Sequence, residues 1–263
     1  MTPTAEWSLP TRQVGRRVLY YDRLASAMTM AAAIAEPGVA VLAGEQTAGR
    51  GQYGRSWCCP PGAGVLLAVV ISPPPAARRP AVLTAWAAVA VADCVQRMTG
   101  LEPRIKWPND VLIDGKKICG ILIESAASSS LTTIAGIGLN VSQSAADFAA
   151  ACLPDATSLA ASSGRSFETT DAARALLEEL DRAYGLLADD LAALEAKWVD
   201  RLGLVGHEVA AEMADGSIHR GHVRRLTLDG LELATAEVVI RLAPEGVRTM
   251  VQGAGDRSPT QQM

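Results

Sequence analysis

The sequence predicts an α+β protein in which a mixed β-sheet with flanking helices is followed by a small antiparallel β-barrel. Between residues 18 and 141, apolar runs of strand length alternate with stretches of helical periodicity. Hairpin signals inside this region, such as Asp114-Gly115, make the sheet mixed rather than purely parallel. Beyond Gly203, short alternating runs are separated by Asp215-Gly216 and Asp229-Gly230 turns, a spacing typical of a small barrel.

Composition limits the possible function classes. The 263 residues suffice for one large domain, or for one domain with a small appendage. The net charge of −4 provides no basic field that would favour nucleic acid. The five cysteines show no metal-ligand spacing, which indicates free thiols in a reducing cytoplasm.

No stretch has the pattern of an export signal or a membrane anchor. The first residues lack an apolar segment of signal-peptide length. The longest apolar runs, near residues 62–71 and 81–92, are shorter than the roughly 20 residues that span a bilayer. We therefore expect a soluble, cytoplasmic protein.

The first half of the chain can be assigned element by element. Residues 1–17 form a polar lead-in, and residues 18–21 form a short strand. Residues 24–35 have helical spacing, with Ser26 as a plausible N-cap, and end before the breaker pair Pro37-Gly38. Residues 39–43 and 65–72 are buried strands. Residues 81–99 form a long helix that Gly100 closes.

The second half of the chain predicts further strands of the sheet, followed by a loop and a helical region. Residues 104–124 predict three strands joined by a Pro-Asn-Asp turn and a hairpin turn, and residues 131–137 a further strand. Residues 142–165 have the composition of a loop, and residues 169–201 form an amphipathic helical region in which Gly185 permits a bend. We expect one domain over residues 18–203, the barrel over 204–251 and a disordered tail over 252–263.

The connection between residues 43 and 57 is the most informative stretch. Gly49, Gly51 and Gly54 alternate there with Arg50 and Arg55. Glycines let backbone N–H groups approach a ligand, and guanidinium groups bind phosphate or carboxylate in bidentate fashion. The stretch matches neither a P-loop nor a dinucleotide-binding fingerprint. It predicts an anion-binding loop; the alternative is a flexible surface hairpin.

A lone cation on an apolar strand points to the same chemistry. Lys106 precedes Trp107-Pro108, a rigid turn that would fix its direction. Such a lysine either extends to water at the sheet edge or serves as a cation beside a phosphate. Together with the two arginines of the loop it predicts a site for an anion, which a nucleotide or a carboxylate would fit.

Four motifs resemble those of bacterial biotin protein ligases of the type without an N-terminal DNA-binding domain. They are G-R-G-x-x-G-R-x-W at 49–57, K-W-P-N-D-V at 106–111, K-x-x-G-I-L-x-E at 117–124 and G-x-G-x-N at 136–140. The likeness covers about residues 18–250. It implies a catalytic domain with a mixed sheet akin to class II aminoacyl-tRNA synthetases, and an SH3-like C-terminal domain.

The resemblance implies a two-step reaction. The carboxylate of biotin attacks the α-phosphate of ATP, which enters with Mg²⁺, and gives biotinyl-5′-AMP and pyrophosphate. A lysine of a biotin carboxyl carrier domain of an acyl-CoA carboxylase then takes the biotinyl group and releases AMP. Biotin and Mg-ATP are substrates, and no prosthetic group is implied. We expect a monomer or homodimer, no DNA and no membrane partner.

The resemblance also implies the roles of individual residues. Lys106 would be the catalytic cation, touching the biotin carboxylate and the α-phosphate, and Arg50 would hold one of these anions. The implied biotin contacts are Ser26, Ala27, Met28, Gln46, Arg50, Gly51, Gln52, Lys106, Gly120, Gly136 and Gly138. The implied ATP contacts are Arg50, Gln52, Arg55, Trp57, Lys106, Asn109 and Asn140. For Trp57 and Trp107 ordinary packing is the alternative.

Two departures from the family pattern bear on ligand binding. Ser26-Ala27-Met28 stands where the family commonly has Ser-Thr-Asn, so polar contacts to biotin are lost. Gln52 stands where the family commonly has arginine, and its amide carries no charge. We expect a weaker grip on the adenylate phosphate.

Three other functions are consistent with parts of the sequence. A lipoate ligase shares the fold and the acyl-adenylate chemistry. A ligase that doubles as a DNA-binding repressor needs an N-terminal helix-turn-helix, for which residues 1–17 leave no room. A non-catalytic biotin-binding relic would explain Met28 and Gln52, but it would not explain why Arg50, Gln46 and Lys106 are present.

Overall fold

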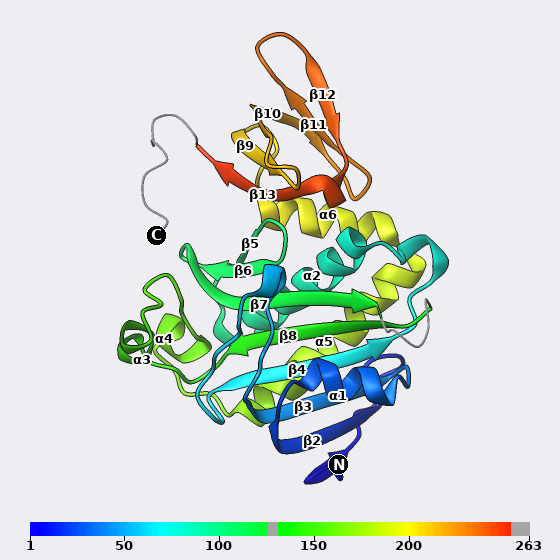
Figure 1. The fold of residues 1–263 in the computed structure, drawn as a ribbon, viewed down its shortest axis with the longest axis vertical. Coiled ribbons are helices and arrows are strands. Elements are labelled where there is room, and N and C mark those ends of the chain that lie inside the picture. The colour runs from blue at the N-terminus through cyan, green and yellow to red at the C-terminus, as the bar shows by residue number, and fades with distance from the viewer. Residues whose placement is uncertain (126–130, 254–263) are drawn as a thin grey trace. The chain divides into compact units, whose positions relative to one another are not determined.

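The computed structural model describes residues 1–125 and 131–253. The chain divides into two compact units, Met1–Arg201 and Leu202–Met263. The first unit is built on an eight-stranded sheet in the order β1-β2-β3-β4-β8-β7-β6-β5 (Figure 1). Its strands are β1 Ala5–Trp7, β2 Arg17–Leu24, β3 Val39–Gln46, β4 Gly64–Ile71, β5 Arg104–Lys106, β6 Asp110–Ile113, β7 Lys116–Ser125 and β8 Thr133–Asn140.

The sheet is mixed, as the sequence predicts. The pair β2–β3 is parallel, and each of the other neighbouring pairs is antiparallel. The Asp114-Gly115 turn between β6 and β7 has positive φ at both residues, 49° and 77°. This is the backbone twist that a two-residue hairpin needs, so the predicted turn is confirmed.

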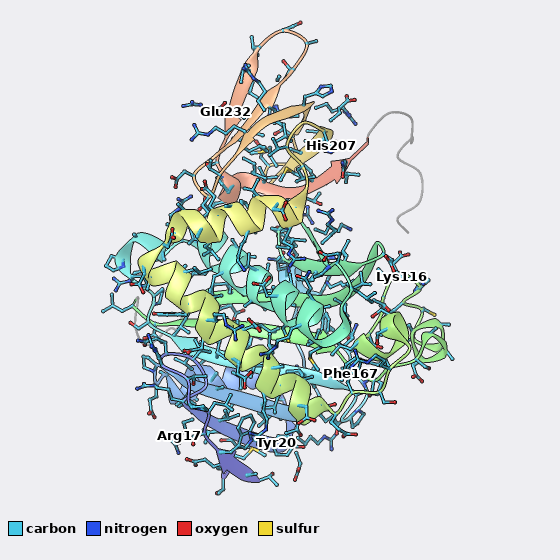
Figure 2. The ribbon with its side chains drawn as sticks, turned by 180° about the vertical axis from the view of Figure 1, so that it is seen from behind. Arg17, Tyr20, Lys116, Phe167, His207 and Glu232 are labelled. Atoms are coloured by element: carbon cyan, nitrogen blue, oxygen red, sulfur yellow. The ribbon has the colours of Figure 1, made fainter. Side chains whose placement is uncertain are left out.

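Helices cover both faces of this sheet. Helix α1 (Ala27–Ile34) packs on β3, β4 and β8, while α2 (Pro80–Thr99) and α5 (Thr169–Asp189) pack together on the opposite face (Figures 1 and 2). The chain between α2 and β5 begins at Gly100, whose φ of 78° gives α2 its expected left-handed C-cap. The sheet core lies between these helices.

Helix α2 is buried around most of its circumference. Trp86 is fully buried on it and its Nε1 donates a hydrogen bond of 3.2 Å to the carbonyl of Leu180 on α5. With 20 residues and a mean hydropathy of 1.3 in its most apolar window, α2 is long and apolar enough to cross a bilayer. The uninterrupted apolar runs of the sequence did not predict this, because they are shorter than the helix. Burial of 67% of that window identifies it instead as the core helix of this unit.

The sequence interpretation was wrong in three places. The lead-in contains β1, an edge strand that pairs with β2. The expected loop at 142–165 holds α3 (Ala145–Ala150) and α4 (Leu159–Ser163), whose N-caps Ser144 and Ser158 bond the first turns. The long helical region is two helices, α5, which runs without a break through Gly185 to Asp189, and α6 (Leu191–Leu202). Between them the Asp190 carboxylate accepts from Ala193 N at 3.0 Å and so caps the start of α6.

The second unit is a five-stranded antiparallel sheet in the order β12-β11-β10-β9-β13. Its strands are β9 Glu208–Met213, β10 Ile218–Leu226, β11 Leu231–Ala234, β12 Val239–Leu242 and β13 Val247–Gln252. Alternate residues such as Val209, Leu231 and Leu233 are buried. This agrees with the expected SH3-like fold class. The predicted disorder of the tail falls, from residue 254 on, outside the described residues.

Candidate active site

A cavity of about 130 Å³ lies where the glycine-arginine loop meets β7 and β8. The start of α1 and the end of β3 complete its wall. The expected biotin contacts that line it are Ser26, Met28, Gln46, Arg50, Gly51, Gln52, Gly120, Gly136 and Gly138. The expected ATP contacts that line it are Arg50, Gln52, Arg55, Trp57 and Asn109. Ala27, Lys106 and Asn140 are not among its lining residues.

The glycine-arginine loop closes on itself above the sheet. Gly51 N donates to the carbonyl of Arg55 at 2.7 Å, and Trp57 N donates to that of Gly49 at 3.0 Å. The turn between them, the 3₁₀ segment Gln52–Gly54, needs left-handed backbone at Tyr53 (φ 57°) and Gly54 (φ 74°). Glycine adopts this conformation without strain, which explains why the loop has one at 54.

Cations converge on the cavity from two elements. Arg50 and Arg55 come from the loop, and Lys117 comes from β7. Arg50 Nη2 lies 2.8 Å from Glu124 Oε2, and Lys117 Nζ lies 2.7 Å from Asp110 Oδ1. Lys117 Nζ is also 5.5 Å from the centre of the Trp57 ring. The site therefore holds more positive than negative charge, an arrangement suited to an anionic ligand.

Lys117 is the lysine that lines this cavity, and Lys106, the lysine expected there, is not among its lining residues. Lys106 is exposed on β5, whereas Lys117 lines the cavity together with Gly120. Alternation along β7 would place Lys117 on the opposite face from Gly120. A bulge between the pairs Val111–Cys119 and Leu112–Lys117 inserts one extra residue and so turns Lys117 toward the cavity.

The backbone of Lys117 is fixed from outside the sheet. Its N–H donates to the carbonyl of Asp155 at 2.7 Å, and its carbonyl accepts from Thr157 N at 2.8 Å. These bonds hold the bulge in place. The K-x-x-G-I-L-x-E motif was the available signal for Lys117, but strand alternation alone gives the wrong face.

Glycines form the floor of the cavity, and side chains already lie on it. A Cβ on Gly138 would be 2.6 Å from Trp57 Nε1, and one on Gly120 would be 2.9 Å from Trp57 Cζ3. A Cβ on Gly136 would be 2.7 Å from Met28 Cγ. The glycines leave room for the indole of Trp57 and the thioether of Met28. Trp57 Nε1 is buried and has no hydrogen-bond partner among the described residues.

Ser26 and Gln46 share the N-terminus of α1. Ser26 is the N-cap residue with extended φ and ψ, yet its hydroxyl makes no capping bond. The first helical N–H, that of Ala27, instead donates to Gln46 Oε1 at 2.7 Å. Ser26 is buried and lines the cavity, which places it beside the space where a ligand would bind. Capping alone does not account for this serine.

The two asparagines are held by the protein itself. Asn140 is buried, donates to the carbonyl of Thr157 at 2.9 Å and accepts from Gln143 Nε2 at 3.1 Å. Its side chain braces the segment beside β8, and the cavity does not reach it. Asn109 Nδ2 donates to the carbonyl of Ile121 at 2.7 Å, which fixes the turn between β5 and β6.

Thiol and metal chemistry have little support at this site. All five cysteines are free, as expected, and burial raises the pKa of Cys59 to about 11 and that of Cys119 well above its usual value. These thiols stay protonated at neutral pH. Within residues 1–125 and 131–253, no group of three or more His, Cys, Asp or Glu side chains could hold a metal ion.

Comparison with known proteins finds similar chains among biotin ligases. Residues 22–142 match the model of the Biotin/lipoate A/B protein ligase family. The biotin--[acetyl-CoA-carboxylase] ligase of Mycobacterium tuberculosis is 33% identical over 227 residues, which are 83% of this chain and 78% of the relative. The enzyme of the same name from Paracoccus denitrificans is 34% identical over 188 residues, 68% and 77% of the two chains.

Solved structures resemble the fold as well. Biotin protein ligase from Aquifex aeolicus, in complex with biotin and ATP, has a TM-score of 0.75, and the match covers 90% of this chain and 99% of that one. Its sequence identity is 21%, so this likeness concerns the fold.

Proposed function

Because the chain belongs to the family of biotin protein ligases, we propose that it is an ATP-dependent ligase that attaches biotin to a lysine of a carrier protein. The main structural support is that Arg50, Arg55 and Lys117 line one cavity, whose floor is formed by glycines. The reaction brings together a carboxylate and a triphosphate, which repel each other. Cations that line the cavity offset this repulsion and the charge of the phosphoryl transition state.

In the first step the biotin carboxylate attacks the α-phosphate of ATP and pyrophosphate leaves. We assign the contact with both groups to Lys117 rather than Lys106; the support is that Lys117 lines the cavity and Lys106 does not. Arg50 provides a planar bidentate partner for the carboxylate or phosphate. Mg²⁺ enters with ATP, bound chiefly by phosphate oxygens, as part of that substrate.

The head of biotin and the adenine occupy different parts of the cavity. Ser26 and Gln46 are the polar groups at the α1 end, where the ureido ring would find a hydroxyl and an amide. Gln46 Oε1 is already bonded to Ala27, so its Nε2 donates to the ligand. Trp57 offers a flat surface and an unpaired N–H, and it moves from Gly138 when the ligand enters. Asn140 has no place in this assignment.

In the second step the lysine of the carrier attacks the acyl carbon and AMP leaves. The carrier is a biotin carboxyl carrier domain of an acyl-CoA carboxylase, in keeping with the names of the relatives. We expect the protein to act in the cytoplasm as a monomer or homodimer, without DNA. These statements rest on the family and on the acidic net charge of −4.

The proposal is tested by biotin-dependent exchange of pyrophosphate into ATP, with lipoate and octanoate run in parallel. Exchange with biotin alone, followed by labelling of a carrier domain, is expected. Exchange with lipoate in place of biotin would assign the protein to the lipoate-type ligases. Absence of exchange with every acid would identify a binding protein that has lost catalysis.

A further inference from the structure

A second cavity of about 610 Å³ adjoins the first and shares several of its lining residues. The loop from Ala48 to Ser56 forms one wall, and Leu122 and Glu124 at the end of β7 form the other. Arg50, Arg55 and Leu122 line both cavities. The second cavity is therefore an approach from the surface to the site where the acyl-adenylate forms.

Glu124 is the one carboxylate among the described residues that line this second cavity. Its side chain is 37% exposed, so it is accessible from solvent as well as from the cavity. It contacts a residue of the adenylation site directly, since its Oε2 lies 2.8 Å from Arg50 Nη2. The other charged side chains on these walls, Arg50 and Arg55, are cations.

The acceptor of the second step is a cation before it reacts. A lysine side chain arrives as an ammonium and must pass the same arginines that hold the anionic adenylate. Like charges repel it there. A carboxylate at the entrance offsets that repulsion, and Glu124 is in the right place to do so.

We propose that Glu124 binds the ammonium of the acceptor lysine at the mouth of the second cavity and so directs it to the acyl-adenylate. This inference rests on the proposed function. Without ligand, Glu124 pairs with Arg50. Once Arg50 binds the adenylate, Glu124 loses its partner and becomes free to accept the lysine, so that acceptor binding follows adenylate formation.

Transfer of the biotinyl group to the lysine needs water as the proton acceptor and AMP as the leaving group. The ammonium loses a proton to water and the neutral amine attacks the acyl carbon. A C–N bond forms while the acyl C–O bond breaks, and its electron pair leaves with the phosphate of AMP. The second amine proton also passes to water, which leaves an amide. Glu124 orients the amine before this step and takes part in no bond change.

The test separates adenylation from transfer in Glu124→Gln, Glu124→Asp and a matched control, Glu45→Gln. Glu45 on β3 also pairs with an arginine, Arg23, at 3.3 Å, but lines neither cavity. Three rates are measured: biotin-dependent pyrophosphate exchange, trapping of the adenylate by hydroxylamine, and transfer to a biotin carboxyl carrier domain. Hydroxylamine is neutral at neutral pH, so it needs no carboxylate to reach the acyl carbon.

In Glu124→Gln we expect the exchange and hydroxylamine rates to stay within twofold of wild type. Transfer to the carrier should fall about tenfold in kcat/KM, chiefly through KM, the size expected for losing one charged hydrogen bond. Glu124→Asp should retain more transfer than the glutamine variant, and Glu45→Gln should match wild type.

Two results would overturn the inference while leaving the proposed function intact. One is unchanged transfer in Glu124→Gln; the other is an equal loss of all three rates, which would restrict Glu124 to holding the loop. A wild-type protein that shows no exchange would overturn the proposed function, and the inference with it.

Discussion

The indole of Trp57 lies against the backbone of Gly138, so closely that a Cβ at 138 would be 2.6 Å from Nε1. The tryptophan comes from the glycine-arginine loop and the glycine from the middle of β8. The loop is thus anchored in the cavity by its last residue while its arginines stay at the rim. We therefore expect Trp57 to move when a ligand enters the cavity.

Gly138→Ala should reduce biotin-dependent pyrophosphate exchange by at least about tenfold, because the new methyl group displaces the indole and fills the floor. The backbone at 138 has no positive φ, so the strand itself accepts alanine. Gly185→Ala is the matched control, since a Cβ there meets nothing within 4 Å in helix α5. Equal exchange in the two variants would contradict the placement of the ligand over Gly138.

Lys117→Met should lower the adenylation rate by about 10²–10³-fold, the effect of removing one donor that stabilises transition-state charge. Lys106→Met should change it little, because Lys106 is exposed outside the cavity. Lys116→Met, also at the start of β7 and exposed, controls for loss of charge. Single-turnover formation of the adenylate measures the effect. A larger loss in Lys106→Met would restore the role that the motif first suggested.

The element types in residues 18–141 could be read from the sequence, because local signals there agree with the fold. The Asp114-Gly115 turn and the Gly100 cap are examples, each set by a residue at the position itself. The helix boundary at Asp190 was not predicted, because an aspartate inside a long amphipathic pattern looks the same whether it caps a helix or lies on an exposed helix face. Gly185 does not interrupt α5, which buries an apolar face against α2 that includes Leu176, Leu180 and Tyr184.

Only those residues of the cavity wall that belong to a recognisable sequence motif could be predicted. Loop and glycine positions were brought together as expected, but Lys117 depends on a bulge that the alternation of β7 conceals. Asn140 looked like a ligand contact, yet tertiary bonds to Thr157 and Gln143 occupy it. Such bonds join segments whose proximity no local pattern encodes.

Gln52→Arg should reduce the escape of the activated intermediate. Gln52 lines both cavities and is uncharged, so an arginine there adds a charged hydrogen bond to the adenylate phosphate. The expected result is about tenfold less biotin on bystander proteins when no carrier is present. Bystander labelling is followed with a streptavidin probe at equal adenylation rates. Labelling that stays at the wild-type level would exclude position 52 as a cause of release.

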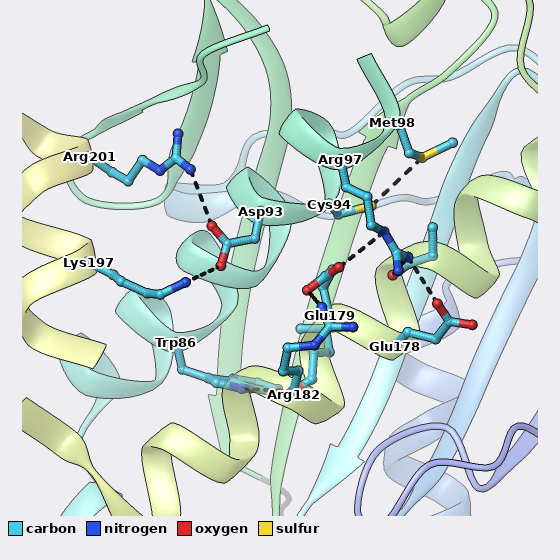
Figure 3. Close-up of polar contacts among 12 residues, drawn as sticks. Trp86, Asp93, Cys94, Arg97, Met98, Glu178, Glu179, Arg182, Lys197 and Arg201 are labelled. Atoms are coloured by element: carbon cyan, nitrogen blue, oxygen red, sulfur yellow. Dashed lines mark hydrogen bonds and ion pairs between the residues drawn. The ribbon is translucent and has the colours of Figure 1, made fainter. Parts of the chain in front are cut away.

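Glu179→Gln should destabilise the first unit by about 1–2 kcal/mol, measured by urea unfolding. The Glu179 carboxylate is 5% exposed and pairs with Arg97, at 3.1 Å, and with Arg182 (Figure 3). Removing its charge weakens both ion pairs and leaves Arg97 with Glu178 as its charged partner. Glu178→Gln is the control, since Glu178 is exposed and should cost less than about 0.5 kcal/mol. Equal losses would show that burial of Glu179 has no energetic effect.

The stability of the protein should fall above pH 9, in part through Cys94. Burial raises the pKa of this thiol from 9.0 to about 12. Between these values the unfolded chain loses the proton while the folded chain keeps it, so the folded state binds more protons and stability declines as pH rises. The contribution is complete below pH 9 and is lost as pH approaches about 12.

Cys94→Ala should therefore flatten the pH dependence of the free energy of unfolding by up to about 1.4 kcal/mol per pH unit in this range. Cys152→Ala, at an exposed thiol, should leave the slope unchanged. Urea unfolding at pH 8, 9, 10 and 11 gives the slope for each variant and for wild type. The slope is compared, and not the stability at one pH, because alanine at 94 also leaves a small cavity that lowers stability at every pH. If the Cys94→Ala and wild-type curves of unfolding free energy run parallel from pH 9 upward, burial does not raise the pKa of the Cys94 thiol in the folded state.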